Sequence, residues 1–193
     1  AFSLRAVTAD PWTDSVTGMT MTPEPVVTYE GHKCWNLDNT YLQRVSGADG
    51  VAVQQEYTQA VWVYWRSSDS GWRTLLRGSE DHWESEAAMI IKEWGRTLGM
   101  YSTRNGKPYW QDSGYDITND MTSWQLVVVT GRGDSATSST GTSTFYTAAE
   151  GDATVTQRGT ANRVVCGTTL HRLGYDGQGP GHVAAAYQGS RSR

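Results

Sequence analysis

The sequence predicts an all-β fold. Glycine is plentiful at 21 residues, and Thr, Ser, Tyr, Trp and Val are common. This composition is typical of proteins rich in strands and turns. The clearest strand pattern lies in residues 57–67, where Val61, Val63 and Trp65 alternate with Trp62 and Tyr64. Both faces of this strand are apolar, so we expect it to be central and covered on both sides. A chain of 193 residues fits one domain.

The N-terminal residues 1–33 differ in kind from the rest. They are rich in residues that break regular structure, namely Pro11, Pro23, Pro25, Gly18 and Gly31. We expect an irregular arm here, with a short strand over residues 25–29. Residues 34–46 then predict a strand with a turn at Asp38-Asn39.

The remaining chain divides into short strands separated by turn signals. Strands are expected over residues 71–79, 97–117, 123–131 and 142–149, and Asn105-Gly106 is a strong hairpin signal. Residues 131–141 predict a mobile loop, Gly159 a turn, and residues 178–181 a tight turn before the last strand. The secondary structure of residues 80–95 is ambiguous. One interpretation is one or two helical turns with Ser79 as the N-cap. The favoured interpretation is a strand over residues 88–93.

Charge and hydropathy exclude several classes of function. With a net charge of −4, the chain lacks the basic surface that nucleic-acid binding requires. The tail at residues 189–193 is basic, but it is short and we interpret it as a solvated terminus. No run of about 20 apolar residues exists to span a membrane. The chain starts at Ala1 without Met, which suggests removal of a targeting segment. The sequence has no Asn-x-Ser/Thr acceptor, which fits a non-glycosylating compartment such as an organelle lumen.

The order of these strands resembles one family. The segment from Cys34 to Tyr187 is similar to laminin-G-like domains in three marks: Trp124 with the apolar run 126–129, Phe145-Tyr146, and a closing hairpin from Leu173-Gly174 to Val183. The sequence of residues 131–146 also resembles uncharacterised algal members of the laminin-G-like family. The resemblance implies a concanavalin-A-like jelly-roll sandwich of two antiparallel sheets over residues 34–188. It also implies binding to glycans or proteins, in some members with Ca²⁺ at one rim, although the acidic ligands of that rim have no clear counterpart here.

The sequence has two cysteines, Cys34 and Cys166. Terminal strands of jelly-roll sandwiches usually lie side by side, so the resemblance favours a disulfide between them over two buried thiols. Such a bond would stabilise the fold by up to about 4–5 kcal/mol in the chain-entropy model and would imply an oxidising compartment. No His/Cys cluster has the ligand spacing of a zinc site.

No catalytic set is readable. Glycan hydrolases on this fold place carboxylates at alternate positions of one strand. Glu84 and Glu86 have that spacing, but His82 interrupts the series that Glu80 would begin, so the segment 80–86 with Asp81 is better explained as a solvated acidic loop. The four histidines, which are His32, His82, His171 and His182, suggest no triad. We therefore expect that the chain is not an enzyme.

Two other groups remain as binding candidates. Asp134 lies in an Arg132-Gly133-Asp134 tripeptide and could offer oxygen ligands to Ca²⁺, although a hydrated loop is favoured. Aromatic side chains at strand ends could stack on sugars, anchor a partner or cover the core, and these are Trp72, Trp83, Trp94 and Trp110. Trp62, Trp65 and Trp124 are expected in the core instead.

These observations leave three functional hypotheses. The favoured one is a non-catalytic subunit that binds partner proteins through the loops and the N-terminal arm, for example an accessory subunit of a photosynthetic membrane complex in the thylakoid lumen. The second is a carbohydrate-binding module, in an extracellular or lumenal compartment, with or without Ca²⁺. The third, a glycan hydrolase, is disfavoured by the carboxylate spacing.

Overall fold

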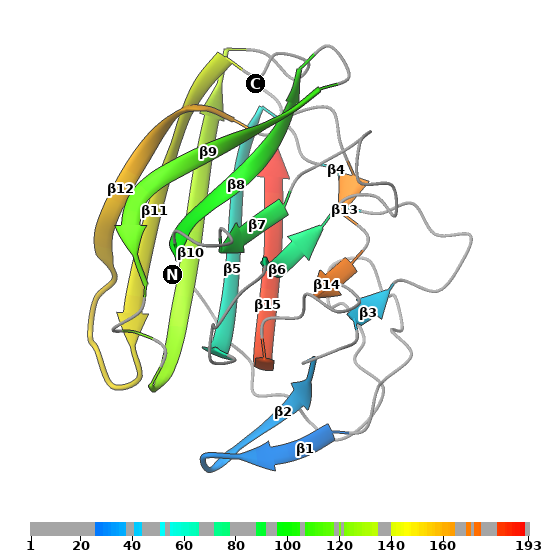
Figure 1. Ribbon diagram of the computed structural model, residues 1–193, viewed down its shortest axis with the longest axis vertical. Helices are drawn as coiled ribbons and strands as arrows, with labels where there is room; N and C mark the ends of the chain where they lie inside the picture. The colour runs from blue at the N-terminus through cyan, green and yellow to red at the C-terminus, as the bar shows by residue number, and fades with distance from the viewer. Residues whose placement is uncertain are drawn as a thin grey trace.

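The computed structural model shows strands and turns, with no α-helix among the residues that it describes. These are residues 26–37, 41–43, 51–52, 55–65, 72–77, 88–91, 96–104, 107–117, 120, 122–134, 140–164, 169–170, 172–174 and 181–191. The strands form two antiparallel sheets that pack into a sandwich (Figure 1). The all-β prediction is therefore confirmed.

The larger sheet contains most of the long strands of the molecule (Figure 1). Its seven strands follow the order β1 (Val26–Tyr29), β2 (His32–Asn36), β15 (Gly181–Arg191), β5 (Glu56–Trp65), β10 (Trp124–Gly133), β11 (Thr140–Ala149) and β12 (Thr156–Arg163). The apolar strand at residues 57–65 is the fourth of the seven, as its two apolar faces predicted. The second and last strands of this sheet in the chain, β2 and β15, are neighbours, because Trp35 of β2 pairs with Val183 of β15.

The second sheet has six strands and is interrupted more often by residues outside the described ranges. Its order is β3 (Tyr41–Gln43), β14 (Arg172–Gly174), β6 (Arg73–Arg77), β7 (Ala88–Ile91), β8 (Thr97–Arg104) and β9 (Lys107–Asp116). A separate pair is formed by β4 (Val51–Ala52) and β13 (Thr169–Leu170). The ambiguous segment at residues 88–91 is thus a strand, and β8 and β9 pair as far as Arg104 and Lys107, as the Asn105-Gly106 hairpin signal predicted.

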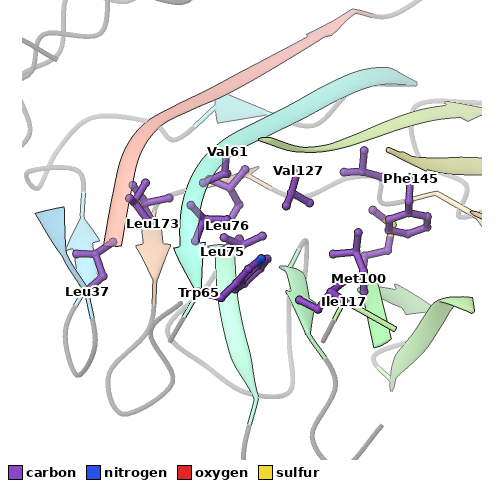
Figure 2. Close-up of a cluster of buried hydrophobic side chains, with 14 of the residues drawn as sticks. Leu37, Val61, Trp65, Leu75, Leu76, Met100, Ile117, Val127, Phe145 and Leu173 are labelled. Atoms are coloured by element: carbon purple, nitrogen blue, oxygen red, sulfur yellow. The ribbon is translucent and has the colours of Figure 1, made fainter. Parts of the chain in front are cut away.

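The core lies between the two sheets and follows the two-residue period of the strands (Figure 2). On β5, Val61, Val63 and Trp65 point inward and are at most 3% exposed. They meet Met100 of β8 and Phe145 of β11, both 0% exposed. Fully burying a large apolar side chain contributes about 1.5–3 kcal/mol, so this set is the main source of stability.

A β-bulge in β6 adds a second inward side chain to the core. The pairing of β6 with β7 slips between Thr74 and Leu76, so two residues of β6 face one residue of β7. Leu75 and Leu76 are consequently both buried in the core, where Figure 2 shows them beside Trp65. Beyond the bulge the alternation resumes, which leaves Thr74 on the outer face of the sheet.

One long side of the sandwich is closed by contact between β9 and β12. A Cβ atom placed on Gly159 of β12 would lie 1.9 Å from the carbonyl oxygen of Ser113 on β9. The two backbones approach this closely because Gly159 has no side chain. The prediction of a turn at Gly159 was therefore wrong: the glycine lies inside a strand and permits the two sheets to meet.

Three other local predictions need correction. Leu173 and Val183 do not form a closing hairpin, because β14 belongs to the six-stranded sheet and β15 to the seven-stranded sheet. The predicted loop at residues 131–141 is shorter, since β10 continues to Gly133 and the amide of Asp134 donates to the carbonyl of Thr140. The predicted basic tail is partly strand, since β15 ends at Arg191.

The end of the predicted N-terminal arm also has regular structure. The short strand expected over residues 25–29 is β1, and it forms a hairpin with β2 through Tyr29 and His32. Residues 1–25 lie outside the described residues, so the arm itself stays a prediction.

Candidate functional site

Two of the four tryptophans that the sequence singled out meet on the outer face of the six-stranded sheet. Trp72 directly precedes β6, and Trp110 lies on β9. Their ring centroids are 5.4 Å apart with an interplanar angle of 70°, which is an edge-to-face arrangement. Both side chains are partly exposed. We call the group formed by Trp72, Thr74, Thr97, Trp110 and Asp112 the tryptophan corner.

The strand register explains how residues so far apart in sequence come together. Thr74 pairs with Ile90, Ile90 with Gly99, and Gly99 with Asp112, so these four residues form one row across β6, β7, β8 and β9. Leu98 and Met100 of β8 are buried in the core, and therefore Gly99 faces outward. The row thus belongs to the outer face.

Gly99 provides the room that the corner needs. A Cβ atom at this position would lie 2.5 Å from Cη2 of Trp110 and 2.3 Å from the carbonyl oxygen of Gln111. The indole of Trp110 therefore lies directly over the glycine, which directs it across β8 toward Trp72.

Asp112 fixes the other edge of the corner. Its Oδ2 accepts hydrogen bonds from Nε1 of Trp110 at 3.1 Å and from Oγ1 of Thr97 at 2.9 Å. Its Oδ1 accepts one from the amide of Gly114 at 2.8 Å. The side chain remains exposed despite these contacts. A carboxylate oxygen has two lone pairs, so Oδ1 can accept a further hydrogen bond from a ligand.

Thr74 adds a polar group at the base of the same face. Its side chain is 0% exposed, and its hydroxyl has no hydrogen-bond partner among the described residues. Buried hydroxyl groups are normally paired, and each exception needs an explanation. Because this side chain is fully buried, it belongs to the base of the corner and is not itself open to a ligand.

The sequence singled out Trp72 and Trp110 but missed Asp112, Thr97 and Thr74. A signal was present, because Trp110 and Asp112 share one face of a strand, as do Thr97 and Gly99. Which strands would lie side by side was not readable, so the two pairs were not connected. Trp83 and Trp94 lie outside the described residues, as do Glu80, Asp81, Glu84 and Glu86.

The predicted disulfide is not supported. Cys34 is a free, buried thiol on β2, and its Sγ lies 3.7 Å from the carbonyl oxygen of Val27. Burial raises the pKa of this thiol above its usual value, and a backbone hydrogen bond from Tyr29 opposes that effect. The partner proposed for it, Cys166, lies outside the described residues.

The Arg132-Gly133-Asp134 tripeptide lies at the end of β10, with Arg132 and Asp134 exposed. Its backbone is fixed by Gln55, whose Nε2 donates to the carbonyl oxygens of Gly133 and Asp134 at 3.0 and 3.1 Å. In the part of the chain that the structure describes, no group of three or more His, Cys, Asp or Glu side chains is arranged to hold a metal ion. Ca²⁺ binding thus stays a prediction.

A second aromatic group, on the outer face of the seven-stranded sheet, holds the β1–β2 hairpin. The ring of Tyr29 stacks on His182 with centroids 3.8 Å apart and planes 6° apart. His32 packs against Trp124 at 5.2 Å, and its Nε2 lies 2.7 Å from Oε1 of Glu150. Trp124 is therefore buried, as expected, but on the outer face rather than between the sheets.

A polar group lies where β9 approaches β12. The hydroxyl of Tyr115 donates to Oδ2 of Asp120 at 2.8 Å, and Cζ of Arg158 lies 4.5 Å from the tyrosine ring centroid. Nε of Arg158 donates to Oγ1 of Thr147 at 2.8 Å. Burial raises the pKa of Tyr115, and the hydrogen bond and charge of Asp120 raise it further, while Arg158 opposes them. The phenol is therefore protonated at neutral pH and acts as a donor.

Comparison with known proteins finds solved structures of low similarity and no family. No protein-family model matches the chain, and no curated protein matches it. One similar solved structure is an engineered GH43 glycoside hydrolase with endo-xylanase and exo-arabinofuranosidase activity, at 15% identity and a TM-score of 0.44. The match covers 78% of this chain and 31% of that enzyme, so this chain spans less than a third of its length.

A second similar structure is the alginate lyase vAL-1 from Chlorella virus. It is 9% identical, with a TM-score of 0.40, and the match covers 90% of both chains. Because no family model matches the chain, the laminin-G-like family is not confirmed.

The sequence led us to exclude enzymatic activity, and that exclusion was wrong. Both of these solved structures are enzymes that act on polysaccharides, one a hydrolase and one a lyase. The absence of a readable carboxylate series in the sequence therefore does not exclude catalysis. Neither similarity assigns a reaction or a catalytic residue to this chain.

No helix in the described ranges has the length and hydropathy required to cross a membrane.

Proposed function

We propose that this chain binds a polysaccharide at the tryptophan corner. The observation that carries the proposal is the partly exposed pair of Trp72 and Trp110, 5.4 Å apart, with the exposed carboxylate of Asp112 hydrogen-bonded to one of them. Ligand sites in general combine apolar and aromatic walls with a few placed polar groups that fix orientation. The corner has both components.

The chemistry of a sugar ring matches this combination. Its C–H faces are apolar and pack against an indole, whereas its hydroxyl groups project from the edge and require hydrogen-bond partners. In an edge-to-face pair, one indole can stack on the ring while the other contacts its side. Asp112 then accepts from a hydroxyl at the edge of the same ring.

The test is a binding screen against soluble polysaccharides, with retention in affinity gels and titration calorimetry as readouts. Trp110→Ala removes one wall of the corner, and we expect it to weaken binding about two- to tenfold, because stacked aromatic contacts are worth about 0.5–1.5 kcal/mol. Tyr146→Ala, a partly exposed aromatic on β11 in the other sheet, is the matched control and should bind like the wild type.

Two outcomes would contradict the proposal. One is a screen in which the folded wild-type chain binds none of the polysaccharides, and the other is binding that survives in both Trp72→Ala and Trp110→Ala. The same mixtures should be assayed for new reducing ends and for unsaturated ends. Either product would add cleavage of the bound chain to the proposed function.

The hypothesis of a subunit that binds partner proteins makes a different prediction. Size-exclusion chromatography of the endogenous protein after gentle extraction would place it in a large assembly, together with identifiable partner chains. Elution near 21.3 kDa combined with polysaccharide retention would favour the tryptophan corner instead. A lumenal photosynthetic complex is one such assembly, and this experiment would name it or remove it.

A further inference from the structure

We infer that the tryptophan corner selects neutral, hydroxyl-rich glycan chains and rejects chains that carry carboxylates, and that Asp112 is the residue that makes this choice. The inference rests on the proposed function and adds the class of ligand. It follows from the position of one exposed charge inside an aromatic site.

The first argument concerns the charge within the corner. Of its five members, Trp72, Thr74, Thr97, Trp110 and Asp112, Asp112 alone has an acidic side chain. Its Oδ2 receives two hydrogen bonds and its Oδ1 one, so three donors hold the carboxylate in place. A uronate carboxylate brought to the same site would face a fixed like charge.

The second argument concerns hydrogen-bond complementarity. An ionised carboxylate only accepts hydrogen bonds, and a sugar hydroxyl can donate one. Hydrogen bonds to a charged acceptor are roughly twice as strong as neutral ones. A sugar hydroxyl placed beside Asp112 therefore gains a hydrogen bond, whereas a carboxylate group placed there has no proton to donate and is repelled.

The third argument concerns Trp110. Oδ2 of Asp112 accepts a hydrogen bond from Nε1 of Trp110, so Asp112 also sets the orientation of the stacking wall. Selection and stacking are thus coupled through one side chain.

The experiment uses matched pairs of polysaccharides and the full chain. Galactomannan and mixed-linkage β-glucan are each compared with a preparation of the same polymer oxidised at C6 to the carboxylate. We expect the wild type to prefer the neutral member of at least one pair by tenfold or more. We expect the discrimination, but not the neutral binding, to shrink as salt rises, because screening weakens repulsion between exposed charges.

Asp112→Asn removes the negative charge of the site and keeps a side chain of nearly the same size and shape. We expect this variant to bind the neutral polymer several-fold more weakly and to lose most of its discrimination against the oxidised one. Glu30→Gln removes one charge at an exposed position in the turn between β1 and β2 of the other sheet, so it is the control and should retain the preference. Circular dichroism spectra that match the wild type would show that both variants fold.

The outcomes distinguish the two proposals. If neither member of any pair binds, the proposed function fails. If the oxidised polymers bind as well as or better than the neutral ones, the function stands and the inference about ligand class is overturned. If Asp112→Asn keeps the full preference for neutral chains, the selection does not come from Asp112.

Discussion

At the scale of single residues, the chain uses polar side chains to fix aromatic ones. Asp112 holds Trp110, Asp120 accepts from Tyr115, and Glu150 lies 2.7 Å from the His32 ring that packs on Trp124. Each carboxylate restricts one ring. Aromatic rings are large contact surfaces, and fixing their orientation in advance lowers the entropy lost when a ligand binds.

The Tyr115–Asp120 contact predicts how stability depends on pH. The pKa of Tyr115 is raised above the usual value near 10, so its contribution is fully present below pH 10 and is lost as pH rises above 10 through the folded-state pKa. We expect Tyr115→Phe to lower the free energy of unfolding by about 1 kcal/mol at neutral pH and to flatten its decline above pH 10. Urea denaturation at a series of pH values measures both effects.

Asp120→Asn provides the companion measurement. It removes the negative charge that raises the tyrosine pKa, so the decline in stability above pH 10 should be smaller than in the wild type and should end at a lower pH. An unchanged slope above pH 10 in Tyr115→Phe would show that this phenol is not coupled to folding. The raised pKa of Tyr64 leaves a residual slope in every variant.

At the scale of elements, the seam between β9 and β12 depends on one glycine. Gly159→Ala would place a Cβ atom 1.9 Å from the carbonyl oxygen of Ser113, so one backbone must move. We expect a loss of about 1–3 kcal/mol in the free energy of unfolding, as for other overpacked sites. Thr160→Ala, which is exposed on the same strand, should change stability by less than about 0.5 kcal/mol. Equal stabilities for the two variants would contradict the close approach.

The sequence predicted individual strands better than their arrangement. Local signals located the central strand β5, the strand at residues 88–91 and the β8–β9 hairpin, because alternation and turn chemistry act over a few residues. It did not predict that β14 and β15 belong to different sheets, or that Gly159 lies in a strand. Both depend on contacts with distant segments, which leave no local pattern.

The same limit applied to the candidate site. Trp72 and Trp110 were recognised as aromatics near strand ends, but their meeting depends on Gly99 and on the register of four strands. The hydroxyl of Thr74 lacks a partner within the part of the chain that the structure describes, and its burial is a property of the packed structure alone. Residue types could suggest an aromatic binding surface, whereas its polar partners required the coordinates.

At the scale of the whole molecule, the fold should not depend on a disulfide. The chain has only two cysteines and Cys34 is a free thiol, so we expect equal melting temperatures with and without reductant. A bond between Cys34 and Cys166 would contribute up to about 4–5 kcal/mol, which reduction would remove with a clear fall in melting temperature. Alkylation of the denatured, unreduced chain should label both thiols, and labelling of neither would contradict the structure.

The paired tryptophans also give the molecule an optical signature. Two indoles with centroids 5.4 Å apart and planes at 70° are close enough for their electronic transitions to couple, and coupled transitions of this geometry produce paired bands of opposite sign in circular dichroism. Either Trp72→Ala or Trp110→Ala would abolish that couplet, while replacing a distant tryptophan would leave it. A ligand that wedges between the rings would change its amplitude, so occupancy of the corner can be followed without a label.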